Sequence, residues 1–371
     1  MQLENTTLNK AVLESAIADG ALGSGEAAAL EKCRQQVLAD ENLLKVYSEL
    51  YDNIFERGKF EFKVFCEIDE FSCIFRMLMA LNWIPRTRAV FEKNSWGEAA
   101  MLETASDAAV WARHCRENFG FYGYNDWSKC LWLSNHGSGR LVQQGRLQFN
   151  IDSVYRHSAV IYRNRTTREV IALAADNAAF DQDGFPAVSA EKIQWTARFS
   201  DDGTTAVGSP ILPTGVAENR VVTLDLTQWY CALRDGDKVI NFHIPETGPM
   251  TVERCRDSVE RAVKFFAEYF PDYPWKAIHI SSWFNDPYYE KYLPPTANII
   301  KFRTAGYLLP EAELGAPVPR VFPGKTPYAG GSSLQNAVYR MLEEKIPFRR
   351  GTLLLLKEDL PWRENVYRKG N

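Results

Sequence analysis

Apolar residues in the first third of the chain recur every three or four positions, which is the spacing of helices with one buried face. Leu43, Tyr47 and Leu50 follow this spacing, and a second series runs through residues 71–81. Glycines and a proline separate the series, and these residues are typical of helix ends. The pattern predicts that residues 7–133 are a helical half of the protein.

The pattern changes to alternation after about residue 140. Residues 141–155 alternate in the manner of a strand, and residues 158–164 with 167–176 predict a β-hairpin. A polar stretch rich in glycine and aspartate follows at 181–219. We expect this stretch to form loops or a peripheral insertion.

Two further apolar runs surround a short turn at Gly236. Residues 221–233 and 238–245 have strand-like composition, and only a few residues separate them. The spacing predicts a second pair of strands joined by a tight connection.

The following segment alternates between helical and strand patterns. Residues 251–269 predict a helix, 276–284 a strand, 286–293 a short helix and 298–309 another strand. This order is typical of a mixed α/β unit. The predicted fold class is therefore α+β, with a helical domain at 1–140 followed by a mixed α/β domain at 141–371.

Charge and composition describe a globular protein with no obvious polymeric partner. The 371 residues are enough for two domains, and the net charge of −4 comes from 43 basic and 47 acidic residues dispersed along the chain. No nucleic-acid partner is indicated. The first residues lack the layout of a secretory signal and no apolar run could cross a bilayer, so we expect a cytoplasmic protein without a membrane partner.

Cysteine spacing and the familiar catalytic motifs exclude several classes. The seven cysteines contain no CxxC pair, so disulfides, a zinc site or another metal cofactor are not expected. The chain also lacks GxSxG, HExxH, GxxxxGK[ST] and GxGxxG. These absences disfavour serine hydrolases of that type, zincins, P-loop NTPases and dinucleotide-binding enzymes.

A candidate anion site lies where the helix at 251–269 begins directly after a strand. The first amides of a helix and the positive end of its dipole can hold a phosphate group. Gly248 permits close approach of the backbone, and Arg254 lies in the first turn, where a cation is favoured only beside an anion. The alternative is that Arg254 faces water or pairs with a nearby glutamate.

Polar residues at the ends of two predicted strands are candidates for chemistry. His243 points away from its apolar neighbours and could act as a base, or could be a hydrogen-bonded structural residue, and His279 is a candidate by the same argument. Ser282 could donate a proton and Trp283 could wall a pocket, although capping and packing explain them equally well. Asp286 is suited to cap the next helix.

Five segments together resemble one family of acyltransferases, with a helical N-acyltransferase N-terminal domain and a GNAT-like C-terminal domain. The segments that carry the resemblance are GRLQF at 145–149, HIPETGPMT at 243–251, SSWFNDP at 281–287, LPPTANIIKF at 293–302 and SSLQNAV at 332–338. The resemblance spans most of the chain. The stretch at about 156–219 departs from the family by being longer than expected, which predicts either a specificity insertion in the GNAT-like domain or a blocked site.

The resemblance implies a donor of the acyl-coenzyme A class, acetyl-CoA or another acyl-CoA, and a small-molecule amine as acceptor. The residues that would hold the donor are Ile244, Gly248, Met250, Thr251 and Arg254. In this reading His243 or Asp286 is the base, Ser282 or Tyr288 is the acid, and Trp283, Arg146 and Gln148 line the substrate pocket.

A second reading is a non-catalytic member that keeps the cleft for another ligand. The GNAT diphosphate loop usually has the pattern Q/RxxGxG/A, whereas residues 246–250 offer one glycine and a proline that has no amide to donate. The poor match of this loop favours the non-catalytic reading. The presence of His243 and of the cluster at 282–286 favours the acyltransferase reading. The sequence does not name the acceptor, the acyl length or the oligomeric state.

Overall fold

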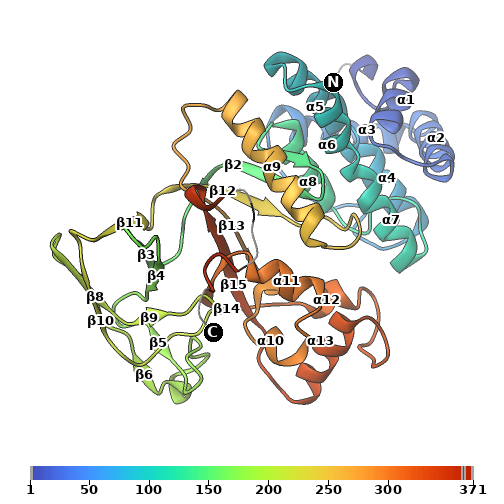
Figure 1. Ribbon diagram of the computed structural model, residues 1–371. Coiled ribbons are helices and arrows are strands. Elements are labelled where there is room, and N and C mark those ends of the chain that lie inside the picture. The colour runs from blue at the N-terminus through green and yellow to red at the C-terminus, as the bar shows by residue number, and fades with distance from the viewer. Residues whose placement is uncertain (1–2, 361, 363–364, 369–371) are drawn as a thin grey trace. The chain divides into compact units, whose positions relative to one another are not determined.

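The computed structural model describes residues 3–360, 362 and 365–368 and divides into two compact units (Figure 1). The first unit contains the chain up to Gln148 together with Ile244–Thr247, and the second contains Phe149–His243 and the chain from Gly248 onward. No helix within the described residues is long and apolar enough to cross a membrane.

The first unit is helical up to Gly137. Its helices are α1 (Lys10–Asp19), α2 (Ser24–Ala39), α3 (Glu41–Tyr51), α4 (Glu70–Ala80), α5 (Trp83–Asn94), α6 (Glu98–Ala105), α7 (Asp107–Phe119) and α8 (Ser128–Gly137), with short turns of helix at Leu3–Asn5 and Asp52–Glu56. Side chains of Asn9, Asp40 and Asp69 accept hydrogen bonds from the first amides of α1, α3 and α4. The predicted helical region is confirmed.

A buried carboxylate joins the last two helices of this unit. Asp107 accepts hydrogen bonds from the indole N–H of Trp111 at 3.1 Å and of Trp132 at 3.0 Å, and it lies 3.2 Å from Nε2 of His136. Each partner therefore satisfies a polar group that has lost contact with water. The hairpin of β1 (Leu141–Gln144) and β2 (Leu147–Val154) then carries the chain into the second unit.

The second unit is built on a mixed sheet with the strand order β2-β12-β13-β15-β14. Its further strands are β12 (Lys238–His243), β13 (Ala277–Ser282), β14 (Tyr307–Leu314) and β15 (Arg349–Leu356). Strand β12 runs parallel to β13, while β15 runs antiparallel to both β13 and β14. The predicted fold class, α+β with a mixed sheet after the helical region, is confirmed.

One face of this sheet is covered by helices. Phe266 of α9 (Val252–Tyr269) lies against Phe149 of β2, and Phe302 of α11 (Asn298–Thr304) lies against Phe242 of β12. The remaining helical segments of the unit are Trp283–Asn285, α10 (Tyr289–Tyr292), α12 (Val318–Val321), α13 (Ser333–Glu343) and Lys357–Asp359.

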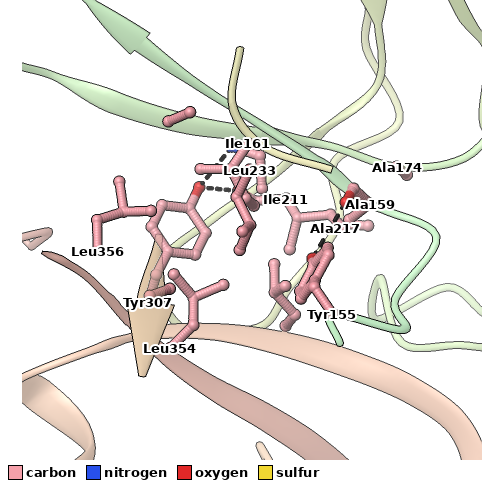
Figure 2. Close-up of a cluster of buried hydrophobic side chains, with 14 of the residues drawn as sticks. Tyr155, Ala159, Ile161, Ala174, Ile211, Ala217, Leu233, Tyr307, Leu354 and Leu356 are labelled. Carbon is pink, nitrogen blue, oxygen red and sulfur yellow. Dashed lines mark hydrogen bonds between the residues drawn. The ribbon is translucent and has the colours of Figure 1, made fainter. Parts of the chain in front are cut away.

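The other face packs against a group of small sheets, and Figure 2 shows the core between them. Leu354, Leu356 and Tyr307 of the main sheet contact Ile161 and Leu233 in this core. The small-sheet strands are β3 (Val160–Asn164), β4 (Val170–Leu173), β5 (Ala179–Phe180), β6 (Trp195–Thr196), β7 (Phe199–Asp201), β8 (Thr205–Gly208), β9 (Pro210–Ile211), β10 (Val222–Asp225) and β11 (Trp229–Leu233), with a turn of 3-10 helix at Ala190–Lys192.

Two local predictions are wrong, and one is confirmed. The predicted hairpin is present as the antiparallel pair β3 and β4. Strand β11, however, pairs with β3 while β12 pairs with β13, so the tight turn at Gly236 joins two different sheets. Residues 298–304 form helix α11 instead of a strand, because a helix brings Phe302 onto both Phe242 and Trp362.

Candidate functional site

The parallel strands β12 and β13 are paired over only part of their length. Lys276 N–H donates to the carbonyl of Lys238, and the ladder then pairs Ile240 with Ile278 and Asn241 with His279. Within the described residues the ladder between these two strands ends there, although β12 runs on to His243 and β13 runs on to Ser282, paired with β15. The pairing of the two parallel strands with each other therefore stops short of their ends.

The side chain of His243 lies beyond the last pair. Because side chains alternate along a strand, His243 projects on the same face as Asn241 and on the face opposite Phe242. Its Nε2 lies 3.4 Å from the side-chain amide nitrogen of Asn241. His279 is the register partner of Asn241 and projects on this face as well. Two histidines thus share one face where the strands separate.

The start of α9 in the second unit has the features of an anion site. Gly248 has φ of +109°, a conformation that favours glycine. The hydroxyl of Thr251 accepts from the amide of Arg254 at 3.4 Å and so caps the helix. The Arg254 guanidinium donates to the carbonyl of Pro249 at 3.4 Å, which holds this cation across the loop. Met250 is buried beside them.

An acidic side chain occupies part of the same helix end. Hydrogen bonds from its own backbone amide and from the Thr251 hydroxyl lower the pKa of Glu253, which is fully exposed. A phosphate group at this helix end would compete with the Glu253 carboxylate for that amide. Arg254 supplies the opposite charge in the next position of the chain.

Three of the sequence candidates belong to the first unit. Ile244 lies in the segment Ile244–Thr247, which that unit includes. Arg146 is buried and donates to the carbonyl of Pro245 at 2.6 Å, and Gln148 is buried and donates to Oε1 of Gln143 at 3.0 Å. Arg146 therefore fixes the segment Ile244–Thr247, and Gln148 stabilises the β1–β2 hairpin.

Asp286 is buried and bound to backbone. One of its oxygens accepts from the amide of Tyr288 at 2.9 Å, and the other accepts from the amide of Arg349 at 2.8 Å. Burial raises the pKa of Asp286, an effect that the two backbone bonds oppose. Each oxygen already organises a turn, so this geometry is that of a structural carboxylate.

The remaining candidates near Asp286 also have structural partners. The Ser282 hydroxyl accepts from the amide of Phe284 at 3.1 Å. The Tyr288 hydroxyl lies 3.3 Å from a carboxylate oxygen of Asp183, and its ring packs on Phe185. Trp283 contacts the ring of Phe284. The structure does not bring these side chains onto the face that carries His243.

A polar cavity of about 220 Å³ lies beside β13 on the His243 face of the sheet. Residues from β13, β14 and β15 line it, and their side chains form a network around Glu311. The Glu311 carboxylate accepts from Ser281 at 2.9 Å and from Thr352 at 2.6 Å. Arg350 donates to Ser281 at 2.7 Å and to Glu313 at 2.9 Å. These contacts fix the acid and its arginine neighbour in place.

Two histidines in the wall of this cavity differ in their hydrogen bonds. Nδ1 of His157 accepts from the amide of Ala159 at 3.0 Å, so its Nε2–H donates to the carbonyl of Pro310 at 3.1 Å. Nδ1 of His279 is shielded from solvent and has no hydrogen-bond partner among the residues that the structure describes. Burial, with smaller effects from His157 and His243, lowers the pKa of His279 to about 4, so its ring is neutral near pH 7.

Sequence reasoning selected His243 and His279 but did not select His157, Glu311 or Arg350. These residues come from separate strands, so only strand pairing brings them together. The alternation of β14 could have identified Glu311, but the apolar run before it resembled a longer strand. Among the described residues, no group of three or more histidine, cysteine or acidic side chains is arranged to hold a metal ion.

Comparison with known proteins identifies the family. Residues 141–351 match the GNAT-like C-terminal domain, which is more than half of the chain. The chain therefore belongs to this family. A search of the curated proteins finds no match.

The fold is also similar to solved acyltransferases. One is an acyltransferase mutant in complex with octanoyl-CoA, with a TM-score of 0.54 and 16% identity, covering 92% of this chain and 87% of that one. Another is an acyltransferase in complex with decanoyl-CoA and teicoplanin, with a TM-score of 0.52 and 17% identity, covering 92% of this chain and 98% of that one. At this level of sequence identity, the similarity shows a shared fold alone.

Proposed function

We propose that this protein is an acyltransferase that moves an acyl group from acyl-coenzyme A to an amine. The observation that carries the proposal is the early end of the β12–β13 ladder, directly before the capped helix α9. A thioester could lie between the separated strands while the diphosphate contacts the helix end. The solved neighbours with octanoyl-CoA and decanoyl-CoA support a donor of this class with a medium-length acyl chain.

The residues suggest how the transfer proceeds. The neutral amine attacks the thioester carbonyl carbon, a C–N bond forms, and the C–S bond breaks. His243, at the separated end of β12, takes the proton that the amine loses, and the thiolate of coenzyme A leaves and gains a proton. Backbone amides at the strand ends can donate to the carbonyl oxygen as its negative charge develops.

The acceptor is proposed to be an amine-bearing molecule. The neighbour bound to teicoplanin supports an acceptor site that accommodates more than a small amine in that protein. In this chain the polar cavity next to His279, of about 220 Å³, has room for the amine group of an acceptor and the atoms next to it.

A second candidate function is ligand binding without catalysis. Pro249 has no amide to donate, and Glu253 shares the helix end with any phosphate group. Both features weaken the diphosphate site. Binding of coenzyme A without turnover, for any amine acceptor, would favour this alternative.

A thermal-shift experiment tests donor binding. Coenzyme A or octanoyl-CoA at a hundred times its dissociation constant should add about 2.7 kcal/mol to the free energy of unfolding, which raises the melting temperature. Pantetheine, which lacks the nucleotide and the diphosphate, serves as the control and should stabilise much less. Absence of a shift with either coenzyme A species would contradict the proposal.

A matched pair of variants tests the role of His243. If His243 is the base, His243→Ala should lower turnover about a hundredfold or more. Lys238→Ala lies at the exposed start of the same strand and should retain full turnover. An equal rate in both variants would assign the proton transfer to another residue.

A further inference from the structure

A cavity of about 530 Å³ lies among the small sheets of the second unit, in a part of the chain that the proposed acyl transfer does not use. Its walls come from β3 and β11 of one small sheet and from β7 and the β7–β8 turn of another. Strands β3 and β7 belong to the stretch at 156–219, whose length departs from the family pattern. The volume is within the range of about 300–1,000 Å³ that is usual for small-molecule sites.

This cavity is separate from the strands that the proposed transfer uses. Side chains alternate along β3, so Ile161 packs in the core against the main sheet and Tyr162 packs in a second core on the opposite face. Tyr162 lines the cavity, which therefore lies on the face of its sheet that is turned away from β12 and β13. Among the described residues, the cavity shares no lining residue with the polar cavity beside β13.

Three aromatic rings line the cavity and remain partly exposed. Phe199 and Trp229 pack at the border of the second core, and Tyr230 lies next to Trp229 in β11. The hydroxyl of Tyr230 donates to the carboxylate of Glu358 at 2.7 Å, which fixes its ring. Aromatic rings with one accessible side favour a planar aromatic ligand, because two rings attract each other beyond the area that they bury.

Two arginines in the same walls make no ion pair with an acidic side chain of the described residues. The guanidinium of Arg165 lies 5.2 Å from the centre of the Tyr230 ring. Nε of Arg234 donates to Sγ of Cys231 at 3.2 Å. Burial raises the pKa of Cys231, so its sulfur is a neutral thiol that leaves the charge of Arg234 uncompensated. Arg234 is thus held through Nε, while its two terminal nitrogens can donate to a ligand.

The acidic side chain in the walls is already engaged. One oxygen of Asp201 accepts from the amide of Gly203 at 2.9 Å, and the other accepts from the hydroxyl of Tyr162 at 2.7 Å. The Tyr162 bond joins the two small sheets at the cavity. Two guanidinium groups against one carboxylate leave the lining with a net positive charge, which attracts an anion.

We propose that this cavity is a second ligand site, distinct from the acyl-transfer cleft, and that it binds an aromatic carboxylate. The ring of the ligand stacks on Trp229, and its carboxylate accepts two hydrogen bonds from the terminal nitrogens of Arg234. Arg165 adds positive potential and orders the Tyr230 ring. Binding at this site does not require that the protein transfers an acyl group.

Calorimetric titration of the full chain with three probes tests the ligand class. The probes are 2-naphthoate, the uncharged 2-naphthamide, and decahydro-2-naphthoate, which keeps the carboxylate but has a saturated ring. 2-Naphthoate should bind at least about tenfold tighter than 2-naphthamide, because a hydrogen bond to a charged group is the stronger one. It should also bind about fivefold tighter than the saturated acid, which cannot stack.

Variants assign the binding to this cavity. Arg234→Gln should lower the affinity for 2-naphthoate about tenfold and leave that for 2-naphthamide unchanged, whereas Trp229→Leu should weaken both about fivefold. Arg198→Gln is the matched control, because Arg198 is an exposed arginine of the same small sheets that does not line the cavity. Arg234 is exposed as well, so its variant tests the site even if Trp229→Leu fails to fold.

Several results would overturn the proposal. These are no binding of 2-naphthoate, equal affinity for 2-naphthoate and 2-naphthamide, or the same loss in Arg198→Gln as in Arg234→Gln. Displacement of 2-naphthoate by coenzyme A would assign the probe to the donor cleft and would overturn it too. Donor binding is measured independently by the thermal shift, so a protein that binds 2-naphthoate but not coenzyme A would contradict only the proposed function.

Discussion

Single residues in this protein show how similar side chains acquire different tasks. Asp286 follows a strand end and was a candidate base, yet both of its oxygens accept backbone amides. His157 and His279 lie in one cavity wall, but only His157 has backbone partners for both ring nitrogens. What each group can do depends on its hydrogen bonds, which the identity of the residue does not reveal.

The lowered pKa of His279 predicts a pH-dependent stability. The pKa of His279 is about 4 in the folded protein and about 6.5 in the unfolded protein. Well above pH 6.5 the imidazole is neutral in both states, so its protonation does not affect the free energy of unfolding. As the pH falls below 6.5, protons bind the unfolded state first and folding weakens, by about 2 kcal/mol at pH 5. Urea unfolding at pH 7.5 and pH 5 should show this loss.

A substitution isolates the contribution of His279 from other titrating groups. The groups that face it include His157, His243, Glu311 and Arg350, and these remain in His279→Gln. The variant should therefore lose less stability between pH 7.5 and pH 5 than the natural protein. The same loss in both proteins would show that His279 is not shielded as described.

Among the elements, α13 illustrates a helix whose start is visible in the sequence. Ser332 accepts from the amide of Gln335 at 3.2 Å, and the Gln335 side chain accepts from the amide of Ser332 at 2.8 Å. This reciprocal pair is a capping box, and it satisfies two amides that the helix itself leaves without partners.

Ser332→Ala should lower the free energy of unfolding by about 1 kcal/mol, because one side-chain acceptor at the helix start is lost. Ser333→Ala is the matched control, since Ser333 is also exposed but lies one position inside the helix. Chemical denaturation of both variants measures the difference. A similar loss for Ser333→Ala would contradict the capping interpretation.

Strand pairing is harder to read from the sequence than the start of a helix. The turn at Gly236 has φ of +90°, as a tight connection requires, but the strands on either side pair with β3 and β13 instead of with each other. Residues 298–304 carry an apolar run that suits a strand or a buried helix, and the contacts of Phe302 decide for the helix. Partners far away in the sequence settled both cases.

At the scale of the whole molecule, the proposed ligand sites lie in the second unit. Each unit has its own helices and core, and the loop before α9 is divided between them at Gly248. A bound ligand suppresses local opening where it makes contacts, so its effect on dynamics should be regional.

Hydrogen exchange should detect this region. Coenzyme A should slow amide exchange in peptides covering residues 248–256 and 279–284, which contain the start of α9 and the end of β13. Peptides from α2 in the first unit should exchange at unchanged rates. Protection spread evenly over both units, or confined to the first, would contradict donor binding at the separated strands.

The sequence by itself determined the helical region, the α+β class, the capped helix after His243 and the resemblance to acyltransferases, because these depend on periodicity, caps and short segments that act locally. The tertiary structure alone decided where β12 and β13 separate and which strands supply His157, His279, Glu311 and Arg350 to one cavity. The physical reason is that strand partners are chosen by packing between distant segments, and the alternation within one strand does not specify its neighbour.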